Sequence, residues 1–338
     1  MTSTPTIRFA VIGCGHIGKR HASIIQAHSD CSLVALCDGK AKEDLDISAY
    51  TDASFFNSID DLLAADLNLD VVVIASPNGY HEAQALKILE KNRHIVIEKP
   101  MALTKASCER IIFKALQKQK HVFCVMQNRY SAPSVWLKEI LEKGVLGKIF
   151  MVQTNCYWNR DDRYYKKDDW HGTKNLDGGT LFTQFSHFID LLYWCFGDIT
   201  NIQAKFNNFA HGHSTDFEDS GFVNFDFVDG GMGSLNYSTA VWQKNLESSI
   251  TIIAENGTVK VGGQYMDEVI YCHVKDYEMP DLSSKNTPHS VGNYKGAAAN
   301  HHFIYDNIVE VLTKKGSIST NALEGLKVVD IIERMYQA

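Results

Sequence analysis

The stretch IRFAVIGCGHIG, residues 7–18, decides the fold of this chain. Its first half is a short β-prone run, its second half holds three glycines in the spacing G-x-G-x-x-G, and residues 17–27 carry apolar side chains at helical spacing. In dinucleotide-binding domains the first glycine permits a tight turn, the second lets the backbone approach a pyrophosphate, and the third lets the helix pack on the strand. The stretch therefore predicts such a cradle, and glycines that form only a turn are the alternative.

The end of the next apolar run carries the acidic residue that such a cradle needs. Residues 33–37 are typical of a strand, and Asp38 follows it about 20 residues after the glycines. A carboxylate at this point holds the ribose 2′-hydroxyl and repels a 2′-phosphate. We therefore predict NAD as the cofactor, and NADP stays open because Lys40 and Lys42 lie close by.

Apolar runs continue the same pattern and predict a first domain over residues 1–127. The predicted strands lie at 71–75, 94–97 and 121–126, and the predicted helices at 80–91 and 104–119. This alternation favours an α/β fold, a Rossmann-type doubly wound parallel sheet. Ligands bind at the carboxyl ends of such strands, where the sequence places Gly13, Asp38, Ser76, Lys99 and Gln127.

From residue 128 the periodicity changes, which predicts a second, α+β domain over 128–338. Strands predicted at 149–153, 221–227, 233–239, 248–253 and 258–261 indicate an open, mostly antiparallel sheet of about six strands. Residues 277–299 show no period and predict a lid or substrate-contacting loop. Helices are predicted at 134–143, 301–314 and 320–336. We expect Thr320 or Asn321 to cap the last one, and the two C-terminal helices can pack back on the first domain.

Length and composition bound the class of protein. A chain of 338 residues, 45% hydrophobic and 22% charged, is typical of a globular protein with two domains. The net charge of −7 argues against a nucleic-acid partner. We find no signal-peptide pattern and no apolar run of about 18 residues, so we expect a cytoplasmic protein without a membrane partner. The eight scattered cysteines contain no C-x-x-C pair, which favours reduced thiols over disulfides or zinc.

Lys99 lies in Glu98-Lys99-Pro100, at a strand end where a bound nicotinamide would react. Oxidation of an alcohol by hydride transfer releases a proton that a side chain must accept. A partly desolvated lysine beside a positive ring has a lowered pKa and can relay that proton. Pro100 restricts Lys99 towards an extended backbone. We predict that Lys99 is catalytic, and a solvated lysine is the alternative.

The glycine-led segment 177–194 is expected to supply the other half of the site. It is predicted as one helix on which Thr183, His187 and Asp190 share a face. An imidazole titrates near neutral pH and suits general acid–base work, and Asp190 can orient its ring. We predict that His187 is catalytic, and a histidine that only packs is the alternative.

Several motifs together resemble the Gfo/Idh/MocA oxidoreductases. They are residues 13–18, Ser76-Pro77-Asn78 with His81, Glu98-Lys99-Pro100, residues 127–130 and the helix that ends at residues 187–190. The resemblance spans nearly the whole chain and implies NAD(P)-dependent oxidation of sugars or cyclitols, with a homodimer or homotetramer built through the C-terminal sheet. The cofactor contacts that follow are Gly13, Gly15, His16, Ile17, Gly18, Asp38, Ser76, Pro77, Asn78, His81, Glu98, Lys99 and Gln127.

Thr183 departs from many polyol-oxidising members of that family, which carry an aspartate four residues before the histidine. A neutral residue there resembles the branch of UDP-N-acetylglucosaminuronate 3-dehydrogenases, and residues 170–179 and 245–252 are similar to the same branch. This resemblance implies oxidation of the sugar C3 hydroxyl before amination in polysaccharide assembly. It leaves Lys99 and His187 as the proton-handling pair.

The loop before the catalytic segment is a candidate for holding an anionic substrate. A buried diphosphate and carboxylate need cationic partners, and an exposed charged loop or an oligomer contact is the alternative. The predicted substrate contacts are Gln127, Arg160, Arg163, Tyr165 as a stacking ring, Thr183 and His301. The pair His301-His302 lacks a third ligand at the usual spacing, so we predict no metal site.

These observations favour one function and leave others open. The preferred one is an NAD-dependent dehydrogenase that acts on a nucleotide sugar. The alternatives are a dehydrogenase of a free sugar or cyclitol, a glycosidase that uses NAD in a transient oxidation, and a non-catalytic NAD-binding sensor, because a fold does not dictate a function.

Overall fold

The computed structural model describes residues 6–167, 169–263, 266–282, 300–314 and 316–338. The chain divides into two compact units. The first holds the residues up to Val125 together with His301–Val329, and the second holds Met126–Asn300 together with Asp330–Ala338. Most of the predicted lid, from residue 283 to residue 299, lies outside the described residues.

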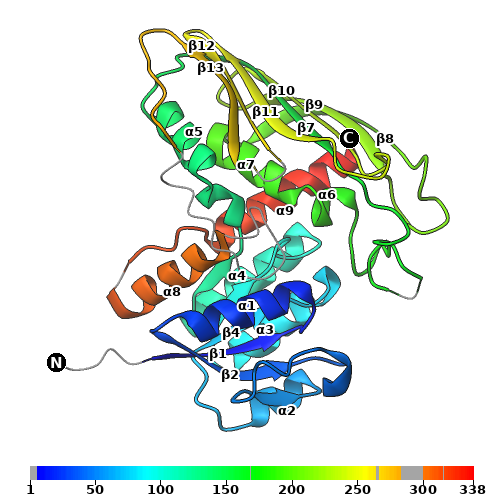
Figure 1. Ribbon diagram of the computed structural model, residues 1–338, viewed down its shortest axis with the longest axis vertical. Coiled ribbons are helices and arrows are strands. Elements are labelled where there is room, and N and C mark those ends of the chain that lie inside the picture. Colours follow the sequence, from blue (N-terminus) through cyan, green and yellow to red (C-terminus); the bar gives the residue numbers. More distant parts are fainter. Residues whose placement is uncertain (1–5, 168, 264–265, 283–299, 315) are drawn as a thin grey trace. The chain divides into compact units, whose positions relative to one another are not determined.

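The first unit is built on a six-stranded sheet in the order β3-β2-β1-β4-β5-β6 (Figure 1). All of its strand pairs are parallel, as a doubly wound fold requires. Its strands are β1 (Ile7–Ile12), β2 (Cys31–Cys37), β3 (Ser54–Phe56), β4 (Val71–Ile74), β5 (His94–Ile97) and β6 (Val122–Cys124). The predicted α/β class is confirmed, although β3 was missed because three residues carry too short a pattern.

Three helices of this unit begin at a side chain that accepts a backbone N–H, from Ser58, Thr104 or Asn321. The helices are α1 (His16–Ala27), α2 (Ile59–Ala64), α3 (His81–Glu90), α4 (Lys105–Lys118), α8 (His302–Lys314) and the first part of α9 (Ala322–Gln337). The Asn321 Oδ1 accepts the backbone N–H groups of Leu323 and Glu324 at 3.0 and 3.2 Å, and Glu324 accepts that of Asn321. This reciprocal capping box confirms Asn321 as the predicted cap of the last helix.

The C-terminal segment is tied to the edge of the first sheet through its backbone. The Cys124 N–H donates to the carbonyl of Thr320 at 2.9 Å, and the Thr320 hydroxyl donates back to the carbonyl of Cys124. An isolated bridge between Phe123 and Asn321 continues the contact. Residues nearly 200 positions apart in the chain therefore complete this unit together.

The second unit is built on a seven-stranded sheet in the order β13-β12-β11-β7-β10-β9-β8. The pair β7–β10 is parallel and the other pairs are antiparallel. The strands are β7 (Ile149–Tyr157), β8 (Ile199–Asn207), β9 (Ser220–Phe227), β10 (Met232–Ser238), β11 (Glu247–Ala254), β12 (Gly257–Gly262) and β13 (Glu268–Val274). The mostly antiparallel sheet is confirmed, with β8 and β13 added at the edges.

Helices α5 (Ala132–Glu142), α6 (Thr180–Thr183) and α7 (Ser186–Phe196) lie on one face of this sheet (Figure 1). The prediction of one continuous helix through residues 180–194 is wrong, because the chain leaves the helical path at Phe185, whose φ and ψ are −115° and 5°. The break buries the Phe185 ring completely, between Trp158 and Tyr237 at centroid distances of 5.2 and 5.4 Å. Packing of this ring outweighs helical continuity.

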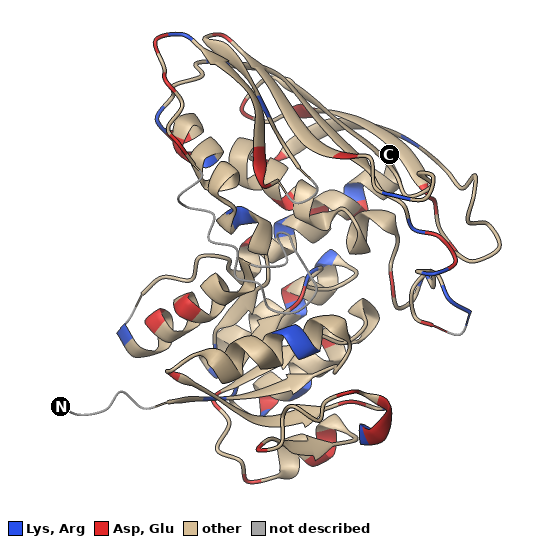
Figure 2. Cartoon of the chain, viewed as in Figure 1, with Lys and Arg blue, Asp and Glu red and all other residues tan. Residues whose placement is uncertain are grey.

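The opposite face of the large sheet presents large apolar side chains. Met151, Phe222, Met232 and Ile253 are 37–61% exposed there, between polar neighbours. A hollow of about 620 Å³ on this face is lined in part by Met151 and Met232. Asp226, from β9, lines the same hollow, so this surface combines apolar side chains with a carboxylate (Asp and Glu are red in Figure 2).

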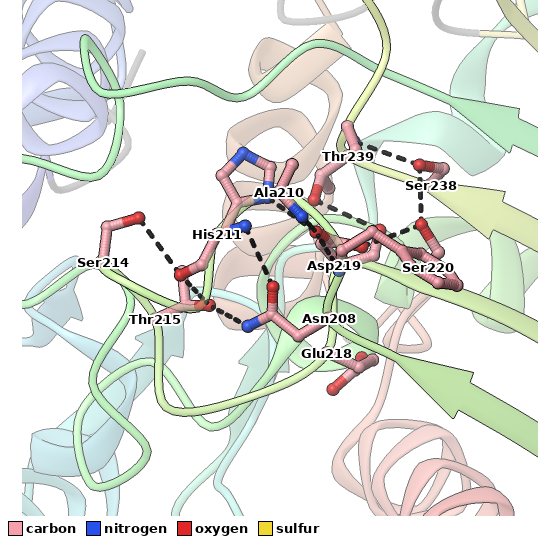
Figure 3. Close-up of polar contacts among 12 residues, drawn as sticks. Asn208, Ala210, His211, Ser214, Thr215, Glu218, Asp219, Ser220, Ser238 and Thr239 are labelled. Atoms are coloured by element: carbon pink, nitrogen blue, oxygen red, sulfur yellow. Dashed lines mark hydrogen bonds and ion pairs between the residues drawn. The ribbon is translucent and has the colours of Figure 1, made fainter.

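A polar cluster around Asp219 fixes the loop between β8 and β9 (Figure 3). Asp219 is 1% exposed, and its Oδ2 accepts the N–H groups of Phe209 and Ala210 at 3.0 and 2.7 Å and lies 3.2 Å from His211 Nδ1. Its Oδ1 accepts the hydroxyl of Ser220 at 2.8 Å. These bonds satisfy a buried carboxylate within the loop itself.

Glu218, the residue before Asp219, joins the C-terminal helix to the sheet. The hydroxyls of Tyr237, from β10, and Tyr336, from α9, each donate to its Oε1 at 2.7 Å. Tyr336 in turn accepts the N–H of Leu181 at 3.0 Å, at the start of α6. Burial raises the pKa of Glu218 to about 7, against the lowering effect of the two phenols.

We expect the stability of the protein to fall as pH rises from about 4.5 to about 7, in part because of Glu218. In this window the folded protein keeps a proton that the unfolded chain releases, so the Glu218 contribution to the free energy of unfolding decreases until pH passes the raised pKa of about 7. Glu218→Gln removes the titration. Thermal unfolding near pH 5 and near pH 8 should show the wild type losing stability relative to the variant. A difference between the two proteins that does not change with pH would contradict this assignment.

Two general features follow from the described elements. Within the described residues, no helix is both long enough and apolar enough to cross a membrane. All eight cysteines, each of which the structure describes, are free thiols.

Candidate active site

The three glycines of the first loop occupy three different environments. A Cβ on Gly13, whose φ is +89°, would lie 2.5 Å from the carbonyl oxygen of Ala75, and a Cβ on Gly18 would lie 1.6 Å from that of Gly13. A Cβ on Gly15 would meet no heavy atom within 4 Å. Gly13 and Gly18 therefore let the turn and the helix pack closely, whereas Gly15 faces open space where a pyrophosphate can approach the backbone.

The amino-terminal end of α1 and the end of β2 provide the groups that a dinucleotide needs. Helix α1 starts at His16 with Gly15 as its cap, and no side chain caps its first amides. Asp38 follows β2, and its carboxylate accepts the N–H groups of Cys14 at 2.7 Å and Lys40 at 2.9 Å. It thus lies against the glycine loop, as the prediction required. The segment that follows carries both signs of charge, since Lys40 and Lys42 are exposed beside Glu43 and Asp44.

His81 holds the ends of two strands together. Its Nδ1 lies 2.8 Å from the carbonyl oxygen of Pro100, and its Nε2 lies 3.0 Å from that of Ser76. The side chain is 0% exposed, so the prediction of a direct cofactor contact is replaced by a supporting role for the Ser76 and Lys99 loops. The Ser76 hydroxyl donates to Gln84 at 2.7 Å.

Glu98 lies in a buried cluster that sequence reasoning missed. Its Oε1 is 2.9 Å from His21 Nε2 and 3.6 Å from His301 Nε2, and His21 Nδ1 is 2.7 Å from the hydroxyl of Tyr305. Burial by itself raises the pKa of Glu98, but the hydrogen bonds and charges of the two histidines hold it well below its usual range. Lys99 donates its backbone N–H to Glu98 Oε2 at 3.2 Å, and the Lys99–Pro100 bond is cis.

This cluster changes the interpretation of His301. The side chain is 1% exposed, so it is too buried for the predicted substrate contact. With His21 and Glu98 it forms a group of ligand-type atoms within 4.8 Å of one another, the kind of arrangement that can hold a cation. The sequence argument against a metal considered only neighbouring histidines and did not foresee His21. The His21–Glu98 distance fits a hydrogen bond and the His301–Glu98 distance fits an ion pair, and we assign no metal ion to the cluster.

In the second unit, His187 is held by Gln127. The amide Nε2 of Gln127 lies 3.0 Å from His187 Nε2, and the two side chains are 9% and 7% exposed. An amide N–H can only donate, so this contact makes Nε2 the acceptor in neutral His187 and places the ring proton on Nδ1. Both oxygens of Asp190 accept from Arg129, at 2.8 and 2.6 Å.

Thr183 is bonded to a carboxylate that the sequence did not reveal as its partner. Its hydroxyl donates to Asp177 Oδ1 and lies 3.0 Å from the Asp177 carbonyl oxygen. Asp177 is 1% exposed and also accepts the N–H of Gly172 at 2.8 Å. Thr183, the neutral residue four positions before His187, therefore has a hydrogen bond to a buried carboxylate six positions earlier in the chain.

The predicted anion contacts have different surroundings. Arg160 donates to Gln184 Oε1 at 2.8 Å and lies over the rings of Trp158 and Tyr164, 4.8 and 5.1 Å from their centroids. Arg163 is 75% exposed and paired with Asp161 at 2.7 Å, so part of its charge is already compensated. The Tyr165 ring is 4% exposed and packs on His211, which leaves no face for the predicted stacking on a substrate.

These features define the class of the protein: a dinucleotide-binding Rossmann unit joined to an α+β unit that carries a buried histidine. Two family models match, "Oxidoreductase family, NAD-binding Rossmann fold" over residues 7–126 and "GFO/IDH/MocA C-terminal domain" over residues 135–260. The chain belongs to the Gfo/Idh/MocA oxidoreductase family, and its first unit is an NAD-binding Rossmann domain.

Solved structures of two WlbA dehydrogenases resemble the whole chain. The enzyme from Chromobacterium violaceum, in complex with NADH and UDP-GlcNAcA, is 31% identical with a TM-score of 0.90, over 100% of this chain and 94% of that chain. The enzyme from Bordetella pertussis, with the same two ligands, is 32% identical with a TM-score of 0.87, over 98% of this chain and 96% of that chain.

Curated relatives are matched over shorter stretches. Inositol 2-dehydrogenase from Salmonella typhimurium is 29% identical over 194 residues, which are 56% of this chain and 54% of that protein. The chain spans about half the length of the first curated relatives that it matches.

The glycine environments give a prediction with a built-in control. Gly15→Ala meets no atom within 4 Å and keeps an allowed φ of −68°, so the fold should remain while the methyl group obstructs the pyrophosphate. We expect the Kd for NAD to rise roughly tenfold or more, equivalent to about 1.4 kcal/mol. Gly18→Ala collides with the Gly13 carbonyl and should lower the unfolding temperature itself. Calorimetric NAD titration and thermal unfolding of both variants check this, and equal loss of stability in both would contradict it.

Proposed function

We propose that the protein is an NAD-dependent dehydrogenase that oxidises a ring hydroxyl of a nucleotide sugar, with C3 of a UDP-N-acetylglucosaminuronate as the preferred position. The observation that carries the proposal is the match over the full chain to two enzymes that were crystallised with NADH and UDP-GlcNAcA. Their 31% and 32% identity exceeds that of the inositol 2-dehydrogenase, which matches only about half of this chain.

The residues of the first unit fit the cofactor. Gly15 leaves room for a pyrophosphate, the uncapped amides of α1 face the same loop, and Asp38 supplies the carboxylate for a ribose. When bound, NAD accepts a hydride from the substrate alcohol. We propose Lys99 and His187 as the groups that handle the proton released from the same alcohol.

Lys99 is suited to this work by its backbone anchor. Its N–H is held by Glu98, and Glu98 is in turn held ionised by two histidines, so the start of the Lys99 loop is fixed. His187 receives a hydrogen bond on Nε2 from Gln127, which keeps the ring in one orientation. Arg160 is the proposed contact for an anionic group of the substrate, because its guanidinium is already aligned by Gln184 and two aromatic rings.

Purified protein mixed with NAD and UDP-N-acetylglucosaminuronate should give a change in nicotinamide absorbance and a 3-keto product. Lys99→Ala and His187→Ala should each lower kcat on the order of 10²-fold, because each removes a proton-transfer group. The double variant should lose little more than the worse single variant if both act on one step. An α-keto acid acceptor is added in parallel, since retained NADH would hide turnover. Loss of NAD binding in either variant would point to a structural role.

A panel of substrates separates the remaining functions. Activity on a free sugar or on inositol with none on UDP-sugars would move the assignment to a polyol dehydrogenase. Release of an aryl group from a glycoside without net NADH formation would indicate the glycosidase. Full biological output from proteins that lack Lys99 and His187 but still bind NAD would identify a sensor.

We also propose that two or more copies assemble through the uncovered face of the large sheet. Met151, Phe222, Met232 and Ile253 are exposed there on neighbouring strands, and the second unit has no helix on that face among its described residues. Exposed apolar patches of this kind mark association surfaces. The apolar side chains of this face suit a second copy of the same face, since a two-fold contact places like residues together.

Met232→Glu should shift the molar mass in solution towards the monomer, because it places two carboxylates in a self-complementary apolar contact. Val228→Glu is the matched control: Val228 is 62% exposed, as Met232 is 58% exposed, but it lies in the turn after β9. Size-exclusion chromatography with light scattering measures both. A wild-type protein that is already monomeric, or equal effects of the two variants, would contradict the assembly.

A further inference from the structure

Asp177 is a buried carboxylate, 1% exposed, whose two oxygens accept from different partners. Oδ2 accepts the backbone N–H of Gly172 at 2.8 Å, and Oδ1 accepts the hydroxyl of Thr183. Thr183 keeps 9% of its surface exposed, so it is the member of the pair that a ligand can reach. Thr183 lies four residues before His187, on the other side of the break at Phe185.

The direction of the hydrogen bond decides what Thr183 can do. A threonine hydroxyl has one proton and two lone pairs, and a carboxylate can only accept. Once the proton is directed at Asp177, the Thr183 oxygen presents only lone pairs to a third group. A hydrogen bond to an ionised oxygen is about twice as strong as a neutral one, so this direction is well fixed.

Asp177 lies close enough to two neighbouring phenols to act on them electrostatically. Burial raises the pKa of Tyr164 and of Tyr165, and the nearby Asp177 carboxylate raises both further. Arg160 has the opposite effect on the same two phenols.

We propose that Asp177 is a positioning residue that acts through Thr183, fixing the Thr183 hydroxyl as an acceptor for a hydroxyl group of the sugar substrate. This inference rests on the proposed function, since it needs a hydroxylated ring as the ligand. A hydroxyl can donate to Thr183, whereas the carbonyl of an oxidised ring has no proton to give.

Only a carboxylate satisfies both partners of Asp177. An asparagine has one acceptor oxygen and one donor NH₂ group. If the asparagine oxygen faces Gly172, its NH₂ group donates to Thr183, and the Thr183 hydroxyl must then direct its own proton elsewhere. If the oxygen faces Thr183, the NH₂ group faces the Gly172 N–H, and neither of these two donors has an acceptor. Asp177→Asn therefore changes the direction of the bond with almost no change in size.

The test uses the full-length protein and three substitutions, Asp177→Asn, Thr183→Val and Thr183→Ser. With whichever sugar, cyclitol or UDP-sugar the wild type oxidises, the first two should each raise KM roughly tenfold while kcat changes less than about threefold, because the lost contact exists in ground and transition states alike. The double variant should be no worse than Thr183→Val alone, since the two residues act in series. Thr183→Ser keeps the hydroxyl and should keep KM.

Asp216→Asn is the matched control. Asp216 is exposed and accepts the N–H of Lys174 at 3.0 Å, so the substitution removes the same charge near the same loop without touching Thr183. It should leave KM unchanged. A tenfold fall in kcat at constant KM for Asp177→Asn, or an equal effect of Asp216→Asn, would overturn the proposal.

Thermal unfolding of the same variants tests the Asp177–Thr183 hydrogen bond without any substrate. The shifts of Asp177→Asn and Thr183→Val should be non-additive, because both remove one bond. Additive shifts would overturn the inference even if the enzyme is active. A different result would reject the proposed function instead: the wild type neither binds nor oxidises any sugar of the panel, but the shifts in unfolding temperature are non-additive. The Asp177–Thr183 hydrogen bond would then exist without a role in substrate binding.

Discussion

The close packing of helix α1 on the first turn is the constraint on which the Rossmann unit depends. A methyl group on Gly18 would lie 1.6 Å from the Gly13 carbonyl oxygen, and one on Gly13 would lie 2.5 Å from that of Ala75. Only hydrogen fits at these two positions, so the end of β4 and the start of α1 meet at the turn. The Asp38 carboxylate also holds the turn, because it accepts a hydrogen bond from the Cys14 N–H at 2.7 Å. Gly15 lies between these two crowded positions and has free space beside it, where a phosphate can approach the backbone.

The second unit depends on buried polar pairs more than on crowding. Gln127 orients His187, Arg129 holds both oxygens of Asp190, and Asp177 holds Thr183. Each of these groups is nearly removed from water, where a polar atom without a partner is costly and a paired one is rigid. The break at Phe185 separates Thr183 from the helix of His187, so these pairs, and not helical continuity, fix the side chains.

Local patterns were enough to predict the framework and the two candidate catalytic residues. The glycine spacing, the alternation of apolar runs and the capping box at Asn321 each act within a few residues, and the structure follows them. Strands β3, β8 and β13 were missed, because short or edge strands bury too few side chains to leave a clear pattern. Tyr165, His81 and His301 were predicted as ligand contacts because their residue types suit such roles, but burial removes them from the surface.

The sequence by itself determined the Rossmann cradle, the position of Asp38 after the second strand and the strand end that carries Lys99, because these follow from backbone geometry within single supersecondary units. Only the tertiary structure decided which side chains form hydrogen bonds with one another. His21 meets Glu98 across 77 positions, Gln127 meets His187 across 60, and the neutral Thr183 gains a carboxylate from Asp177. Periodicity places a side chain on a face of its own element, whereas the group opposite it is chosen by packing between elements far apart in the chain.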